Sequence, residues 1–306
     1  MPSHPSSLST ESAPEISVCV PIFNEEENVS LLHDAIVSAL EPTGRSFEMV
    51  LVDDGSSDTT VARLTEIAAR DPRLVIVRFQ RNYGQTAAMM AGIDHAQGRY
   101  VVTMDGDLQN DPLDIPMMLT KLDDGYDLVV GYRINRQDKF LTRKVPSKIA
   151  NWLIGKVTGL PIRDNGCSLK VYRAEVIKQV PLYSDMHRFI PAMTTPMGAR
   201  VAEVGVRHHA RRFGVSKYGL SRIFKVLIDL ITVKTLQIFA RRPLARFSGV
   251  AAIVAGAAAL AVLALDGSNL VIKTAVVGLL TTLALFLLFL GLITGALFQG
   301  VRARGP

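Results

Sequence analysis

Cysteine and tryptophan are scarce in this chain, and two common nucleotide-binding sequences are missing from it. The 306 residues include two cysteines, Cys19 and Cys167, and one tryptophan, Trp152. Two cysteines so far apart form neither a disulfide framework nor a zinc site, and they are consistent with a reducing cytoplasm. No Gly-x-Gly-x-x-Gly follows a strand-like run, and no Gly-Lys-Ser or Gly-Lys-Thr occurs. These absences argue against a dehydrogenase or a P-loop enzyme.

An apolar secretory signal is also missing from the first residues. Met1–Glu15 is rich in serine and proline, and the apolar run that follows, Ile16–Phe23, is too short to act as a signal. We therefore expect residues 1–15 to be a disordered tail.

Charged side chains are absent from two long stretches near the end of the chain, residues 247–265 and 274–298. At about 1.5 Å per residue, each is long enough to cross a hydrocarbon layer of roughly 30 Å. We predict a two-helix transmembrane hairpin over residues 247–300, followed by a cytoplasmic tail at 301–306. The alternative is a pair of buried helices in a soluble core.

Basic residues flank this hairpin on the side of the chain ends. Arginines at 241, 242 and 246 precede the first span, and arginines at 302 and 304 follow the second. The positive-inside rule therefore places both chain ends in the cytoplasm, as in a multi-pass protein of the inner (plasma) membrane. Residues 218–246 carry apolar side chains at helical spacing with interrupting charges, which predicts an interfacial amphipathic helix.

The formal net charge of +6 is modest, but basic residues are concentrated between Arg133 and Arg246. This concentration suggests contact with anionic lipid or phosphate. Aromatic residues are not interleaved there, as a protein that binds single strands would need, so we do not expect a nucleic-acid partner.

Apolar runs alternate with helical segments from residue 16 to about residue 217. The expected strands cover residues 16–22, 47–52, 74–79, 100–104, 127–132, 169–172 and 201–209. We expect helices from Asn24 to about Leu40, from a cap at Ser56 or Ser57 to about Arg70, and over residues 86–95. This alternation predicts an α/β domain with a mainly parallel sheet.

One expected strand, Tyr100–Met104, ends in Asp105-Gly106-Asp107. Two carboxylates this close repel each other unless a cation lies beside them, and we expect Gly106 to let the backbone bend so that both face it. A divalent ion on a nucleotide phosphate would meet this demand. A solvated Asp-Gly-Asp turn is the alternative.

Acidic residues follow two other expected strands as well. Glu25 comes after the first strand, and Asp53 and Asp54 come after the second. In a parallel sheet these strand ends share one edge, so the acids should converge with Asp105 and Asp107. We expect Asp53 to accept hydrogen bonds from a base or ribose, and Asp107 to hold the metal that bridges the diphosphate.

These acids belong to a longer series of motifs that resembles family 2 inverting glycosyltransferases. The likeness is greatest to the polyprenyl-phosphate glycosyltransferase subgroup, which includes dolichol-phosphate mannose synthase and bacterial polyprenyl-phosphate glucosyltransferases. It covers nearly everything after the first fifteen residues. The motifs that carry it are Pro21-Ile22-Phe23-Asn24-Glu25, Val52-Asp53-Asp54-Gly55-Ser56, Arg81-Asn82-Tyr83-Gly84, Met104-Asp105-Gly106-Asp107-Leu108-Gln109, Asp164-Asn165-Gly166-Cys167-Ser168 and Arg212-Phe213-Gly214-Val215-Ser216-Lys217-Tyr218.

The resemblance implies a GT-A fold and the transfer of a sugar, with inversion, from a nucleotide diphosphate to polyprenyl phosphate. It favours a UDP-sugar such as UDP-glucose, Mg²⁺ or Mn²⁺ as cofactor, and a homotetramer. The roles that it implies are nucleotide binding by Pro21, Glu25, Asp53, Asp54 and Asp105; metal binding by Asp107 and Gln109; lipid-phosphate binding by Arg133, Arg143 and Ser147; closure over the donor phosphates by Arg212, Ser216 and Lys217; and a general base at Asp164.

Some of these roles have alternatives. A solvated basic face is the alternative for Arg133, Arg143 and Ser147. Asp164 could position the sugar or its neighbours, because a phosphate monoester with a second pKa of about 6 is already a nucleophile. A processive polysaccharide synthase is disfavoured because no Gln-x-x-Arg-Trp occurs. A membrane-anchored scaffold without activity is disfavoured by Asp105, Asp107 and Lys217.

Overall fold

A computed structural model describes residues 13–134, 151–180 except 153 and 157, 186–210, 243–264 and 270–302, with backbone alone at 196 and 295–302. The chain divides into two compact units at Asp229, and each unit is described by itself. Glu15, the last residue of the expected tail, hydrogen-bonds to Ser46 through its backbone N–H. Residues 1–12 and most of the expected interfacial helix, 218–242, lie outside the described residues.

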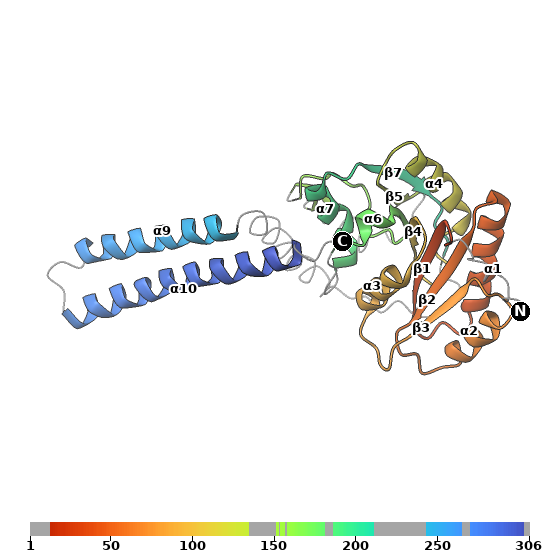
Figure 1. Cartoon of the computed structure of the whole chain (residues 1–306), viewed down its shortest axis with the longest axis horizontal. Coiled ribbons are helices and arrows are strands. Elements are labelled where there is room, and N and C mark those ends of the chain that lie inside the picture. Colours follow the sequence, from red (N-terminus) through yellow and green to blue (C-terminus); the bar gives the residue numbers. More distant parts are fainter. Residues whose placement is uncertain are drawn as a thin grey trace, which may run out of the picture. The chain divides into compact units, whose positions relative to one another are not determined.

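The described part of the first unit is built on one mixed sheet of seven strands in the order β3-β2-β1-β4-β6-β5-β7 (Figure 1). β6 pairs in antiparallel fashion with β4 and β5, and all other pairs are parallel. The expected mainly parallel α/β fold is therefore confirmed. The strands are β1 (Ile16–Ile22), β2 (Phe47–Asp53), β3 (Leu74–Arg78), β4 (Tyr100–Thr103), β5 (Leu128–Arg133), β6 (Lys170–Arg173) and β7 (Val201–Val206).

Helices cover both faces of this sheet (Figure 1). One face packs on α1 (Val29–Leu40), α2 (Thr60–Ala68) and α4 (Ile115–Asp123). The other packs on α3 (Gln85–His95), α6 (Ala174–Ile177) and α7 (Ile190–Thr194). Short 3₁₀ turns complete the described unit: η1 (Glu41–Thr43), η2 (Pro112–Asp114), η4 (Met186–Phe189) and η5 (Thr195–Met197).

The central strand β1 shows why the two faces form. Its residues alternate between the faces, with Val18 and Val20 in the core beside α1 and Cys19 in the core beside α3. All three side chains are fully buried. A strand covered on both faces reads as a nearly continuous apolar run, which is how the sequence predicts it.

Two expected helix starts are wrong. The first helix begins at Val29, not at Asn24, because Asn24 has a φ of 54° and cannot continue a right-handed helix. The second begins at Thr60 without a serine cap, and Asp58 accepts a hydrogen bond from the Thr60 N–H instead. Ser56 accepts a hydrogen bond from the Asn24 N–H, so it joins two loops.

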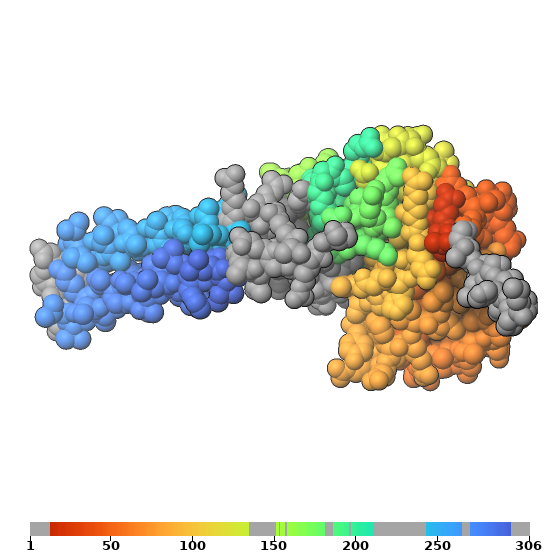
Figure 2. Space-filling model, viewed as in Figure 1, coloured from red at the N-terminus to blue at the C-terminus, as the bar shows by residue number. Residues whose placement is uncertain are grey.

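The second unit contains two long apolar helices, α9 (Pro243–Ala264) and α10 (Leu270–Arg302). By length and composition both could cross a membrane. α9 takes in residues 243–246, which the sequence assigns to the interfacial segment. The two helices lie side by side (Figures 1 and 2).

Small residues make this contact between α9 and α10. Ala251 and Ala258, one heptad apart on α9, are buried although most side chains of these helices are exposed. At Gly291 of α10 an added Cβ would lie 2.8 Å from the Phe247 Cβ of α9. Close approach at small residues is typical of helix pairs in membranes.

A substitution at Gly291 tests this packing. Gly291→Leu would force the helices apart, and we expect it to reduce stability by about 1 to 3 kcal/mol. Gly278→Leu on the same helix is the matched control, because an added Cβ there meets nothing within 4 Å. Thermal unfolding in detergent, followed by circular dichroism, should separate the two variants. Equal melting temperatures would contradict the packing.

Candidate active site

The carboxyl ends of β1, β2 and β4 lie next to one another in the sheet. Ile22 at the end of β1 pairs with Asp53 of β2, and β4 runs parallel on the other side of β1. The residues that follow these strands include Glu25, Asp54 and Asp105. The structure therefore brings the expected acids to one edge of the sheet.

Asp53 and Asp54 are both almost completely buried. Both oxygens of Asp53 accept from the Ser56 N–H, at 3.2 and 3.3 Å. Asp54 accepts from two backbone groups of another loop, with Oδ1 2.7 Å from the Tyr83 nitrogen and Oδ2 2.9 Å from the Gly84 nitrogen. Asp54 therefore holds the loop that leads into α3.

The Asp54 loop and the Arg81–Gly84 loop touch through their backbones. Gly55 has a φ of 75°, and a Cβ added there would lie 2.5 Å from the Arg81 carbonyl carbon. Only glycine meets both conditions. Two motifs that are far apart in sequence thus form one wall of the site.

The residues after β1 are tied to the same wall. The Asn24 side chain accepts from the Ser57 N–H at 2.8 Å, and the Glu25 N–H donates to the Thr60 hydroxyl at 2.9 Å. The Glu25 carboxylate accepts a hydrogen bond from the Asn28 side chain. Pro21 precedes them in β1 and is partly exposed.

The backbone bends at Gly106 in the Asp105-Gly106-Asp107 turn, as the sequence predicts. A Cβ on Gly106 would lie 2.6 Å from Ile22 Cδ1, so a larger residue would require the end of the Ile22 side chain to move. The unusual backbone angle falls on Leu108, with a φ of 58°. Asp107 is buried, and its Oδ1 accepts from the Gln109 N–H at 3.1 Å.

Asp105 has side-chain partners from two directions. Gln85, the first residue of α3, donates from Nε2 to Asp105 Oδ1 at 2.7 Å. Burial raises the pKa of Asp105, and the neighbouring Asp107 carboxylate raises it further. The Ser168 hydroxyl, Lys170 and Arg133 oppose this rise in pKa. Gln85, Ser168 and Lys170 are absent from the sequence-based set of site residues.

Gln109 lies between the acids and the end of β7. Its side-chain amide donates to the His209 carbonyl at 3.4 Å, and the His209 N–H donates to the Gln109 carbonyl at 2.8 Å. Arg207 holds the same strand end by two ion pairs. Its Nη1 lies 3.1 Å from Asp111 Oδ2, and its Nη2 lies 2.8 Å from Asp114 Oδ1. The residues that lead toward position 211 therefore leave the sheet beside the expected metal ligands.

Arg133 and Asp164 form a two-point ion pair. Arg133 Nε lies 2.6 Å from Asp164 Oδ2, and Nη2 lies 2.9 Å from Oδ1. The two side chains are only 14% and 10% exposed. An expected lipid-phosphate ligand and the expected base are thus direct partners, and pairs with this fork geometry are among the strongest in proteins.

The acids suit a divalent cation that is held partly by substrate. In the described part of the chain, no group of three or more His, Cys, Asp or Glu side chains is arranged to hold a metal. Mg²⁺ and Mn²⁺ often bind through one or two carboxylates together with substrate phosphates. The hard oxygen donors of Asp107 and Gln109, beside Asp105, fit that kind of site.

Five expected site residues cannot be placed. They lie outside the described residues and are Arg143, Ser147, Arg212, Ser216 and Lys217.

Comparisons with known proteins show which family and which relatives this chain resembles. The model of glycosyl transferase family 2 matches residues 17–180. The chain is 49% identical over 253 residues, 81% of this chain and 75% of the relative, to a dodecaprenyl-phosphate galacturonate synthase from Rhizobium johnstonii. It is 37% identical over 300 residues, 94% of this chain and 91% of the relative, to an undecaprenyl-phosphate 4-deoxy-4-formamido-L-arabinose transferase from Edwardsiella ictaluri.

A solved structure shares the fold. Glucosyl-3-phosphoglycerate synthase from Mycobacterium tuberculosis, in complex with Mn²⁺, uridine diphosphate and phosphoglyceric acid, matches with a TM-score of 0.56. The match covers 73% of this chain and 78% of that chain, at 20% identity. The expected GT-A architecture is therefore confirmed.

The loop clamp at Asp54 gives a testable expectation. Asp54→Asn would place an amide N–H₂ against one of two backbone donors, and we expect a loss of about 2 kcal/mol in stability. Glu26→Gln is the matched control, because Glu26 also accepts from a loop N–H, that of Thr59 at 3.0 Å, but is only partly buried. Thermal unfolding measures both. A larger effect at Glu26 would show that the buried clamp is unimportant.

Proposed function

Because this chain belongs to glycosyl transferase family 2, we propose that it transfers a sugar from a nucleotide diphosphate to polyprenyl phosphate with inversion. One observation carries the proposal. The acids after β1, β2 and β4 converge at one sheet edge, and Arg133, which pairs with Asp164, is close enough to oppose the rise in the pKa of Asp105. The relatives named above for transfer to polyprenyl phosphates support the same reaction class.

The proposal also concerns which nucleotide sugar is the donor. A UDP-sugar is favoured, with UDP-glucose as the example that the family resemblance offers. The name of the relative at 49% identity adds galacturonate to the sugars that deserve a first test. Glu25, Asp53 and Asp54 would shape the nucleoside end of the site, with Pro21 and Asp105 beside them.

Charge stabilisation would drive the reaction. The leaving group is a diphosphate, and a divalent cation on Asp107 and Gln109 would neutralise the charge that develops on it. Arg212, Ser216 and Lys217 would close over the same phosphates. The acceptor phosphate is largely ionised near neutral pH and needs no strong base.

The pairing of Asp164 supports a positioning role over a role as base. Both of its oxygens accept hydrogen bonds from Arg133. A carboxylate in such a pair is a weak proton acceptor, because the neighbouring guanidinium favours its ionised form. Asp164 would therefore hold Arg133 in place for the acceptor phosphate, together with Arg143 and Ser147.

The acceptor also suggests where the enzyme works. Its phosphate lies at the headgroup plane, so the active site must reach a membrane surface. We place the protein in the bacterial inner membrane, with α9 and α10 as a transmembrane hairpin and the catalytic unit in the cytoplasm. A homotetramer is the assembly that the family resemblance implies.

A transfer assay tests the function. Full-length protein in detergent receives Mn²⁺ or Mg²⁺, undecaprenyl phosphate and a radiolabelled donor: UDP-galacturonate, UDP-glucose or GDP-mannose. We expect label in the organic-soluble lipid from at least one UDP-sugar. Label in an insoluble polymer would support a processive synthase. No transfer from any donor would support a scaffold without activity.

Asp107 is the residue that separates metal-dependent catalysis from simple nucleotide binding. We expect Asp107→Asn to reduce transfer by about 100-fold or more, because the cation would lose a carboxylate ligand. Asp124→Asn is the control, since Asp124 pairs with Lys121 at the surface and is 54% exposed. Initial rates over a Mn²⁺ titration measure the effect. Unchanged Mn²⁺ dependence in Asp107→Asn would assign the metal elsewhere.

A double-mutant cycle tests the role of Asp164. If Asp164 acts by holding Arg133, Asp164→Asn and Arg133→Gln should each lower kcat/KM for the lipid by about 10- to 100-fold. The double variant should then lose little more than either single variant. Kinetics over a range of polyprenyl phosphate concentrations provide the values. Multiplicative losses would instead indicate independent roles, as expected for a base.

A further inference from the structure

Lys170 is a buried lysine beside the acids of the candidate site. It begins β6 and pairs with Thr103 of β4 on one side and Val130 of β5 on the other. Its exposure is only 3%. An ammonium group out of water is costly unless other groups compensate its charge, so its surroundings must supply that compensation.

Lys170 has neighbours in two parts of the site: the donor half, which contains Asp105, and the acceptor half, which contains Arg133 and Asp164. Its Nζ donates to the Cys167 carbonyl at 2.5 Å, and the Cys167 N–H donates to the Asp164 carbonyl at 3.2 Å. Lys170 therefore secures the loop that presents Asp164 to Arg133. Burial lowers the pKa of Lys170, while Cys167, Asp105 and Asp164 act in the opposite direction and Arg188 adds to the lowering.

The sheet topology explains why this one residue can serve both halves. β6 lies between β4, which leads to Asp105, and β5, which ends at Arg133. Because β6 runs opposite to its neighbours, its first residue lies at the edge where theirs end. Lys170 is therefore positioned between the nucleotide side and the expected acceptor side.

Resting on the proposed function, we propose that Lys170 is a positioning residue that joins the donor and acceptor halves of the site. Its ammonium fixes the Cys167 carbonyl and balances the carboxylates of Asp105 and Asp164. The carboxylates of Asp105 and Asp164 lie near the charges of Arg133 and Lys170, and Arg188 is a further cation near Lys170. Loss of Lys170 leaves the carboxylates undercompensated and the Asp164 loop unanchored.

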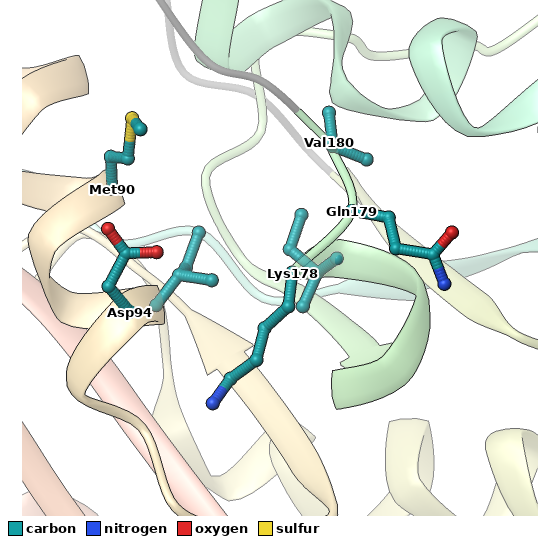
Figure 3. Close-up of a pocket in the computed structure, with 7 residues that line it drawn as sticks. Met90, Asp94, Lys178, Gln179 and Val180 are labelled. Atoms are coloured by element: carbon teal, nitrogen blue, oxygen red, sulfur yellow. The ribbon is translucent and has the colours of Figure 1, made fainter. Parts of the chain in front are cut away.

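Three variants test this role. Lys170→Met removes the charge and keeps much of the volume, and Lys170→Arg keeps the charge. Lys178→Met is the matched control, because Lys178 Nζ also donates to a backbone carbonyl, that of Ala96 at 2.6 Å. Lys178 lines a cavity of about 160 Å³ together with Met90 and Asp94 of α3 (Figure 3), away from the acids of the site.

Transfer kinetics give the first measurement. We expect Lys170→Met to lower kcat by about 30-fold and to change the KM for the donor by less than about threefold, because the nucleotide loops after β1 and β2 stay intact. Lys170→Arg should stay within about fivefold of the natural protein, and Lys178→Met within about twofold. A natural kcat in Lys170→Met, or equal losses in Lys170→Met and Lys178→Met, would overturn the proposal.

The second measurement is the binding of Mn²⁺ alone, followed by electron paramagnetic resonance. Lys170→Met should bind Mn²⁺ at least as tightly as the natural protein, because a positive charge near Asp105 and Asp107 has been removed. General damage to the fold would weaken binding instead, and that result would overturn the proposal. If the natural protein transfers no sugar, the proposed function fails, and the Mn²⁺ comparison still decides the role of Lys170.

Discussion

Several carboxylates lie close together at one edge of the sheet and repel one another. The loops around this edge stabilise them with hydrogen-bond donors and cations, in two ways. Asp53 and Asp54 are satisfied by backbone N–H groups, so they are part of the loop framework itself. Asp105 and Asp164 are satisfied by side chains, Gln85 and Arg133. Side chains can exchange one partner for another when a ligand arrives, whereas backbone donors remain fixed. The second pair of acids is therefore better suited to change partners during a reaction.

The reversed strand β6 adds a buried lysine, Lys170, to the arginine that β5 brings to the site, Arg133. In a parallel sheet, ligands collect at the carboxyl ends of the strands, and here those ends bring mainly acids. An antiparallel strand places its beginning at the same edge, and β6 begins with Lys170. Its preceding loop contributes Asp164 and Ser168. Without this reversal, the loop from 164 to 168 would enter the sheet at the opposite edge, far from Asp105. The topology thus sets the charge balance of the site.

The sequence predicts the seven described strands to within a few residues because buried strands are apolar runs, and it predicts the converging acids because they directly follow those runs. Its failures have physical causes. Lys170 occupies a strand position, where charge is costly, so nothing local marks it as part of the site. Gln85 and Ser168 act through hydrogen bonds that depend on how α3 and the loop before β6 pack. The early helix start at Asn24 fails because that residue has a left-handed backbone conformation, set by contacts with Ser56 and Ser57 in a distant loop.

The charges also bear on what the proposed reaction requires. A lipid phosphate that attacks a nucleotide diphosphate brings one anion toward another, and the acceptor is already ionised. The main obstacle is then electrostatic repulsion, for which a proton acceptor offers no help. Fixed cations reduce that repulsion before the substrates meet, and they need no reorganisation during the reaction. Arg133 held by two hydrogen bonds to Asp164, and Lys170 held by a backbone carbonyl, are fixed in this sense. The geometry of the site therefore favours preset positive charge over general-base catalysis.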